Sequence, residues 1–215
     1  MKKLLVIAGP SAVGKTTVSD EIARQNSNFS LVRSATTRAP RGDGHDSEYV
    51  YMTRDEFYSA IAAGDMLEHT EYSGALYGTP RSEVERILGE GGIPMLILDL
   101  AGVAALANSD YRDSSLRVYL YDELDTLEKR LYARYMTTPS ADGLAKFVKR
   151  KEQNIADYAG FDKYAKLFDI LVSNAGSVTE TAEKILAAMK EIRQDNKNDT
   201  VTALSTMAAA KVGKK

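Results

Sequence analysis

The stretch KLLVIAGPSAVGKTT, residues 3–17, decides how the N-terminal part of the chain folds. Residues 3–8 are almost continuously apolar, which is typical of a strand covered on both faces of a parallel sheet. Gly9 to Thr16 fit the pattern G-x-x-x-x-G-K-[ST], and helical periodicity follows from Lys15 to Gln25. A strand, a glycine-rich turn and a helix in this order predict a phosphate-binding loop. The alternative is a glycine-rich turn that binds no ligand.

Each residue type in this loop suits phosphate chemistry. Glycines let the backbone turn so tightly that successive N–H groups point at phosphate oxygens, and the helix that follows adds its positive end. Lys15 can reach the β- and γ-phosphates, and the Thr16 hydroxyl can ligate Mg²⁺. The loop therefore predicts a nucleoside triphosphate bound with Mg²⁺. The residues expected to contact it are Gly9, Ser11, Ala12, Val13, Gly14, Lys15, Thr16 and Thr17.

Strand-like and helix-like segments alternate along the rest of the chain. Strands are expected at residues 94–100, 116–121 and 168–173, and helices at 124–135, 144–158 and 178–193. This alternation predicts an α/β fold with a mostly parallel sheet flanked by helices. Residues 33–77 break the rhythm and hold one short helix after a Thr53…Glu56 capping box, so we expect an inserted lobe there.

The same patterns divide the chain into consecutive parts. We expect a core with the phosphate loop over residues 1–33, an acceptor-binding lobe over 34–80, more core over 81–125, a helical lid over 126–158, core over 159–194, and a flexible or loosely helical tail over 195–215.

Composition limits the kind of protein this is. Of its 215 residues, 44% are hydrophobic and 27% are charged, which is a globular profile and excludes a wholly disordered chain. Lys and Arg total 28 against 30 Asp and Glu, so a broad basic face for duplex nucleic acid is not expected. Cysteine is absent, and the longest apolar runs are far too short to span a membrane. We expect a cytoplasmic enzyme with small-molecule partners, with no nucleic-acid or membrane partner.

Further motifs follow the loop in order. They are S-x-T-T-R-x-P-R at Ser34 to Arg41, Tyr49, the run from Gly64 to Glu68, Tyr77-Gly-Thr-Pro80, Asp99-x-x-Gly102, Leu127-x-x-Arg130-x-x-x-Arg134, and Asn174 after the last strand. With the phosphate loop, this set resembles the guanylate kinase family from about Lys3 to Met189. The resemblance implies a P-loop kinase that transfers a phosphoryl group from ATP to GMP or dGMP with Mg²⁺.

The resemblance also assigns roles to individual residues. Glu68 would recognise guanine together with the hydroxyls of Ser34 and Thr79. The acceptor phosphate would be held by Arg38, Arg41, Tyr49 and Tyr77. Asp99 would orient Mg²⁺ or the Lys15–phosphate array. Lys15, Arg38, Arg130 and Arg134 would be catalytic, with Arg130, Arg134 and Arg150 acting as lid arginines. Asn174 resembles an adenine-side contact and equally fits a turn residue before a helix.

The chemistry of these residues agrees with that assignment. Guanine offers N1–H and N2–H₂ as parallel donors, which a carboxylate can accept, whereas adenine presents a different edge. The acceptor phosphate has a second pKa near 6 and is already mostly a dianion at neutral pH, so no base has to deprotonate it. His45 and His69 are therefore assigned structural roles, with His69 expected to pack in the lobe.

Some features depart from the family, and three alternatives remain. Ile97 stands where the family often has the first Asp of Asp-x-Asp, and the link from Arg41 to Tyr49 is one residue short. One alternative is a kinase of another small phosphate, such as a sugar phosphate. Another is a GTPase switch, suggested by Asn196-Lys-Asn-Asp199, although that string follows an amphipathic helix instead of a buried strand. The third is a non-catalytic interaction module, which the intact phosphate loop disfavours.

Overall fold

A computed structural model describes residues 2–40, 46–72, 74–190 and 198–212. Its main sheet has five parallel strands in the order β2-β7-β1-β8-β9. The strands are β1 (Leu4–Ala8), β2 (Phe29–Leu31), β7 (Ile93–Ile97), β8 (Ser115–Tyr121) and β9 (Ile170–Ser173). All five residues of β1 are buried, as expected for the middle strand of a sheet with both faces covered. The α/β fold expected from the sequence is confirmed.

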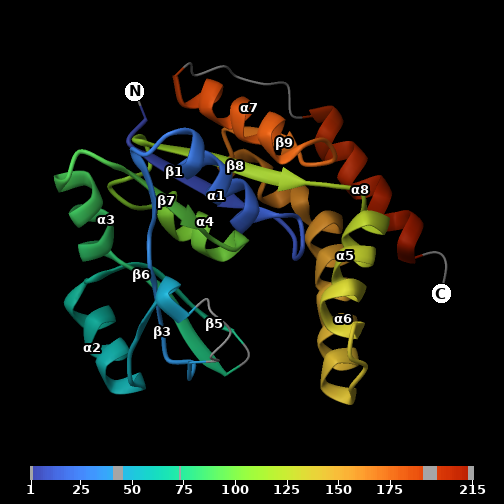
Figure 1. Cartoon of the computed structure of the whole chain (residues 1–215), viewed down its shortest axis with the longest axis horizontal. Helices are drawn as coiled ribbons and strands as arrows, with labels where there is room; N and C mark the ends of the chain where they lie inside the picture. The colour runs from blue at the N-terminus through green and yellow to red at the C-terminus, as the bar shows by residue number, and fades with distance from the viewer. Residues whose placement is uncertain (1, 41–45, 73, 191–197, 213–215) are drawn as a thin grey trace.

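Helices flank this sheet (Figure 1). They are α1 (Lys15–Gln25), α3 (Arg81–Gly89), α4 (Leu100–Leu106), α5 (Leu124–Met136), α6 (Ala141–Ala159) and α7 (Val178–Lys190). The reciprocal bonds of Ser177 and Glu180, each 3.2 Å from backbone N–H to side-chain oxygen, cap the start of α7. The chain between α6 and β9 forms two short 3-10 turns, Phe161–Lys163 and Ala165–Leu167.

A second, smaller sheet lies below the main one (Figure 1). Its order is β4-β3-β6-β5, built from β3 (Ser34–Thr36), β4 (Tyr49–Tyr51), β5 (Met66–Tyr72) and β6 (Ala75–Pro80), with a 3-10 turn at Asp46–Glu48. The helix α2 (Arg54–Ala63) packs on it through buried Phe57 and begins with the expected Thr53–Glu56 capping box. The sequence analysis anticipated this helix but not the four strands, because they are short and interrupted by polar residues.

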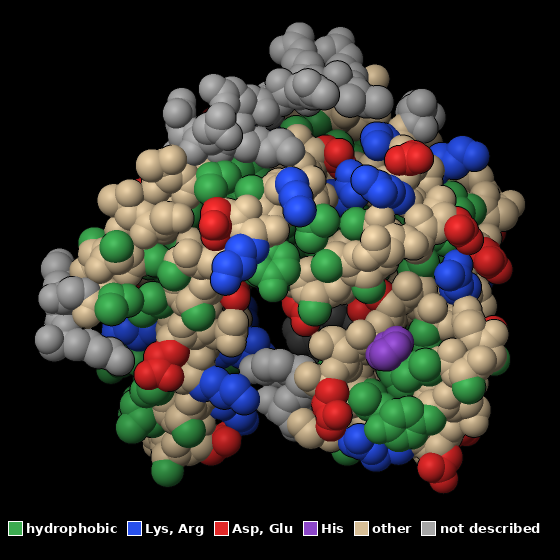
Figure 2. Space-filling view, turned by 180° about the vertical axis from the view of Figure 1, so that it is seen from behind, with side chains coloured by type: hydrophobic (Ala, Val, Ile, Leu, Met, Phe, Trp, Pro, Cys, Tyr) green, Lys and Arg blue, Asp and Glu red, His purple; other side chains and the backbone are tan. Residues whose placement is uncertain are grey.

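Two parts of the molecule project from the core and face each other. One is the second sheet with α2, and the other is the helix pair α5 and α6 (Figure 1). Seen from behind, a hollow separates them, with Lys and Arg side chains along the helix-pair side (Figure 2). The carboxyl ends of parallel strands are where such sheets bind ligands, so this hollow is where a site is expected.

The C-terminal segment differs from the flexible tail predicted from the sequence. Residues Asn198–Val212 form a helix, α8, that packs along α6, and its Leu204 and Ala208 are fully buried. The Ala-rich composition suggested weak helicity, but small residues let α8 approach α6 closely and bury one stripe. Residues Asn198–Val212 are therefore packed against the folded core.

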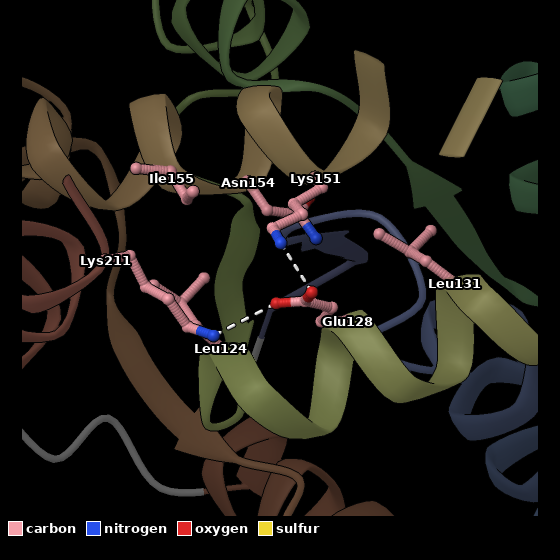
Figure 3. A pocket seen from close by; sticks show the side chains of 7 residues that line it. All are labelled: Leu124, Glu128, Leu131, Lys151, Asn154, Ile155 and Lys211. Carbon is pink, nitrogen blue, oxygen red and sulfur yellow. Dashed lines mark hydrogen bonds and ion pairs between the residues drawn. The ribbon is translucent and has the colours of Figure 1, made fainter. Parts of the chain in front are cut away.

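A charged side-chain bridge joins α8 to the helix pair (Figure 3). Glu128 of α5 accepts hydrogen bonds from Lys151 of α6 at 2.5 Å and from Lys211 of α8 at 3.0 Å, and Lys211 also pairs with Asp125. Glu128, Lys151 and Lys211 line a small pocket together with Leu124, Leu131, Asn154 and Ile155. Within the described residues, no helix is both long and apolar enough to cross a membrane.

Candidate active site

The phosphate loop, Gly9 to Thr16, connects β1 to α1 at the carboxyl edge of the main sheet. Gly9 and Gly14 have φ angles of +154° and +101°. A Cβ atom at Gly9 would lie 2.4 Å from the Leu120 carbonyl oxygen, and one at Gly14 would lie 2.7 Å from Nδ2 of Asn174. Only glycine fits either position, because both the backbone angle and the space exclude a side chain.

Lys15 begins α1 and folds back over the loop. Its Nζ donates to the carbonyl oxygens of Gly9 at 2.8 Å and Pro10 at 3.1 Å. Burial lowers the pKa of Lys15 to about 8, with a further lowering by Arg150; Asp157 opposes it. A triphosphate would favour the charged amine again, because an opposite charge nearby stabilises the protonated form.

Thr16 and Asp99 are the residues expected to hold Mg²⁺. Thr16 is exposed on the first turn of α1, and Asp99 caps α4, where its Oδ1 accepts from the Gly102 N–H at 2.7 Å. The charge of Asp99 raises the pKa of Lys15, against the lowering by burial. Mg²⁺ keeps several waters and is usually held by substrate phosphates with one or two protein oxygens. A hydroxyl and a single carboxylate fit that requirement.

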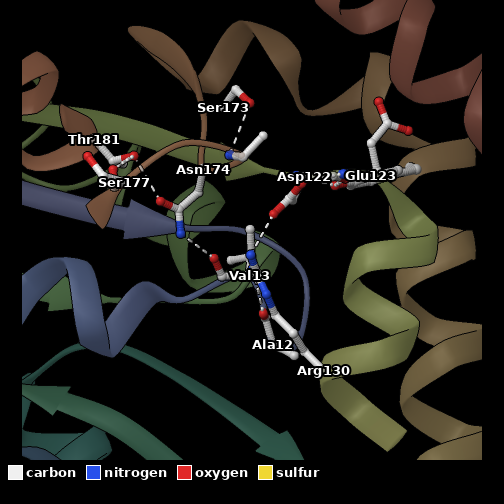
Figure 4. A network of polar contacts seen from close by, with 11 residues as sticks. Ala12, Val13, Asp122, Glu123, Arg130, Ser173, Asn174, Ser177 and Thr181 are labelled. Atoms are coloured by element: carbon white, nitrogen blue, oxygen red, sulfur yellow. Dashed lines mark hydrogen bonds and ion pairs between the residues drawn. The ribbon is translucent and has the colours of Figure 1, made fainter. Parts of the chain in front are cut away.

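Asn174, at the end of β9, braces the loop from the other side. Its Nδ2 donates to the Val13 carbonyl at 2.7 Å, and its Oδ1 accepts from the Thr181 hydroxyl at 2.8 Å (Figure 4). Both the Nδ2 and the Oδ1 of this buried amide thus have hydrogen-bond partners within the protein. The contact with adenine that the resemblance implies stays a prediction.

Two of the three arginines predicted to form a lid, Arg130 of α5 and Arg150 of α6, contact the phosphate loop. Arg130 donates through Nη1 to the Ala12 carbonyl at 3.3 Å, and its Nη2 lies 2.9 Å from Oδ2 of buried Asp122 (Figure 4). Arg150 donates to the Ser11 hydroxyl oxygen at 3.3 Å. Arg134 is exposed, yet its charge also lowers the pKa of Lys15. The structure thus brings Arg130 and Arg150 into contact with the loop, and the place of Arg134 in a lid stays a prediction.

Glu68 of β5 is the buried acid of the second sheet, with 7% of its surface exposed. The Thr79 hydroxyl donates to its Oε1 at 2.7 Å, so Thr79 orients this carboxylate. Burial raises the pKa of Glu68 to about 7; the Thr79 bond lowers it and the charge of Asp99 raises it. A Cβ at Gly102 would lie 3.0 Å from Oε2, so the carboxylate lies against the first turn of α4.

A cluster of aromatic and basic side chains lies on β4, on β6 and just after β3 of the same sheet. The Arg38 guanidinium lies 5.0 Å from the centre of the Tyr49 ring, and the Tyr49 and Tyr77 rings meet edge to face at 6.5 Å. Ser34 pairs with Tyr49 in the register of β3 and β4. Arg41 lies outside the described residues. Arg38, Tyr49 and Tyr77 therefore form a group of donors next to the Glu68 strand.

Some residues of the site escaped the sequence analysis. Asp122 holds Arg130, Tyr51 donates to Asp46 at 2.5 Å beside Arg38, and Asp157 lies near Lys15. The fourth, Asn154 of α6, bonds the backbone of Ser11. They lie outside the motifs, and the only signal for Asn154 is a polar residue on the inner side of an amphipathic helix.

The structure revises the prediction for His69, and it describes only part of the string Asn196–Asp199. His69 was expected to pack in the lobe, but its side chain is exposed, because it follows Glu68 on β5 and points to the opposite face. Of the string considered as a GTPase motif, Asn196 and Lys197 lie outside the described residues, and Asn198 and Asp199 begin α8. A guanine-binding loop after a buried strand is therefore not formed at Asn198 and Asp199.

Comparison with known proteins agrees with this geometry. A family model described as guanylate kinase matches residues 1–196. The guanylate kinase of Homo sapiens is 34% identical over 192 residues, covering 88% of this chain and 94% of its own. That of Cereibacter sphaeroides is 31% identical over 198 residues, covering 91% and 90%. A crystal structure of guanylate kinase from Anaplasma phagocytophilum superposes with a TM-score of 0.63 at 22% identity, covering 91% of this chain and 88% of that one, and so shares its fold.

Proposed function

The chain belongs to the guanylate kinase family, and we propose that it transfers the γ-phosphoryl group of ATP to the phosphate of GMP, and of dGMP, giving ADP and the diphosphate. The observation that carries this proposal is the buried Glu68–Thr79 pair of the second sheet, in a molecule that also has a complete phosphate loop. A carboxylate already fixed by a hydroxyl at 2.7 Å is preorganised to accept the two parallel N–H groups of guanine.

The donor side would act by positioning and charge neutralisation. The N–H groups of the loop and the Lys15 ammonium would bind the β- and γ-phosphates. Mg²⁺, held by Thr16 and oriented by Asp99, would neutralise charge that develops on the phosphates. Arg130 and Arg150 contact the loop, and together with Arg134 they would stabilise the transferred group and exclude water.

The acceptor side would need no general base. The phosphate of GMP is mostly a dianion at neutral pH and can attack the γ-phosphorus directly, with ADP as the leaving group. Arg38 would neutralise part of its charge, and the phenols of Tyr49 and Tyr77 would donate to its oxygens. Arg41 would add a second guanidinium. These roles follow from a planar guanidinium binding phosphate through two N–H groups.

A panel of acceptors tests this function. Formation of ADP from ATP and Mg²⁺ is measured with GMP, dGMP, AMP, CMP, UMP and a sugar phosphate. We expect turnover with GMP, weaker turnover with dGMP, and background with the others. Glu68→Gln should lose GMP turnover while ATP binding persists, because an amide presents a donor where guanine also has one. Equal turnover with AMP or with the sugar phosphate would overturn the assignment.

A further inference from the structure

The helix α6 holds one residue of the phosphate loop, Ser11, through both of its backbone polar groups. The Ser11 N–H donates to Oδ1 of Asn154 at 2.8 Å, and Nδ2 of Asn154 donates to the Ser11 carbonyl at 3.0 Å. Asn154 is 2% exposed, so both bonds are shielded from water. A buried amide with both ends satisfied by one residue fixes the position and the rotation of that residue's backbone.

Ala12, the residue after Ser11, has an unusual backbone conformation. Ala12 has a φ of +66°, and it is the one non-glycine residue with positive φ in the described part of the chain. It is the third residue of a turn closed by the Val13 N–H and the Pro10 carbonyl at 3.4 Å. A positive φ at that position favours glycine, because a Cβ crowds the neighbouring carbonyl oxygen. Ala12 must therefore be held by its surroundings.

Among the contacts that hold the loop, those of Asn154 are the ones best placed to do this. Asn174 holds Val13, on the far side of the turn. Arg130 and Arg150 reach Ala12 and Ser11 with longer bonds of 3.3 Å from side chains that the transferred phosphoryl group would attract. Asn154 is neutral, buried and bonded to both backbone groups of Ser11, the residue directly before Ala12, so it can keep its contacts when a triphosphate binds.

We propose that Asn154 is a positioning residue of the donor site: its amide clamps the backbone N–H and C=O of Ser11 and keeps Ala12 left-handed, so that the loop presents its N–H groups to the triphosphate. The proposal rests on the proposed function for its ligand, the triphosphate of ATP. It also explains how a loop with alanine at this turn position can be used for phosphate binding, and it links α6, which carries Arg150, to that loop.

The test compares variants by calorimetric titration of ATP–Mg²⁺ and, separately, of GMP. Asn154→Ala should weaken ATP binding about tenfold, the size expected for losing two buried hydrogen bonds, and leave GMP binding within about twofold. Glu152→Ala, at an exposed position of the same helix, is the matched control and should change neither. Melting temperatures without nucleotide show that each variant is folded.

A second pair of variants isolates the role of Ala12. In an Ala12→Gly background the left-handed conformation is no longer strained, so adding Asn154→Ala should cost less than about threefold in ATP affinity. A tenfold loss in both backgrounds, an equal loss of ATP and GMP affinity, or a lower melting temperature with ATP affinity unchanged would each overturn the proposal. Triphosphate binding is measured without an acceptor, so a failure of GMP turnover in the unmodified protein would count against the proposed function and not against the clamp.

Discussion

Glu68 shows how a single residue can serve a site at the expense of the fold. Its side chain is buried beside Asp99, and its pKa is raised to about 7 from an ordinary value of 4.5, first by burial. Between these two values the folded protein keeps a proton that the unfolded chain has lost. The free energy of unfolding therefore falls as pH rises through this window, and the full penalty is present above pH 7.

Replacing Glu68 by glutamine should remove this penalty. Without nucleotide, Glu68→Gln should raise the free energy of unfolding at pH 8 by about 1–3 kcal/mol and change it little at about pH 3, where the glutamate is protonated in both states. Urea unfolding at the two pH values measures this. The control is Glu85→Gln, an exposed carboxylate on α3, which should have little effect at either pH. A gain at about pH 3 as large as the gain at pH 8 would show that the ionisation of Glu68 is not the cause.

At the same scale, the sequence predicted residues that have a chemical signature and missed those that act through geometry. Lys15 and Glu68 belong to motifs whose spacing indicates their chemistry. Asn154 contacts the backbone of Ser11, which lies more than a hundred residues away in the sequence. Asp122 contacts Arg130 from just before the start of α5. Such contacts depend on how helices are placed in space, which a local pattern does not contain.

Among the elements, the helix pair α5 and α6 brings the charged side chains of Arg130 and Arg150 to the phosphate loop. Asp122 is 2% exposed at the start of α5; its Oδ1 accepts from the Glu123 N–H at 2.8 Å, and its Oδ2 pairs with Arg130 at 2.9 Å. Arg130 therefore has two tasks. It neutralises a buried carboxylate, and it presents the rest of its guanidinium to the phosphate loop.

Arg130→Ala should affect both tasks. We expect kcat with GMP to fall by about 10²–10³, because a preorganised cation beside the transferred group is lost. The free energy of unfolding should also fall by about 1–3 kcal/mol, since Asp122 is left as an unpaired buried charge. Steady-state kinetics and urea unfolding measure the two effects, with exposed Lys129→Ala as the control. Unchanged turnover would show that Arg130 does not act on the transferred group.

For the whole molecule, the sequence predicted the core well and the periphery less well. The buried strands and amphipathic helices of the main sheet follow from apolar periodicity, and α1 lies where that periodicity placed it. The second sheet has strands of three to seven residues, whose pairing is decided by neighbours distant in the chain. The packing of α8 was not expected for a related reason, since its low amphipathicity gives no sign that it has a surface to cover.

The position of α8 decides whether the C-terminal segment stabilises the fold or only extends from it. It lies beyond the residues matched by the family model, which end at 196. If it is docked as the structure shows, Leu204→Ala should lower the free energy of unfolding by about 2–4 kcal/mol, because a fully buried leucine loses its contacts and leaves a cavity. Thr206→Ala, on the exposed side of the same helix, should change it by less than about 0.5 kcal/mol. GMP turnover at low temperature should be equal in both variants, because neither side chain reaches the site. Urea unfolding distinguishes the two cases: a free tail would make the two substitutions equally silent, whereas a docked helix makes only the buried one costly.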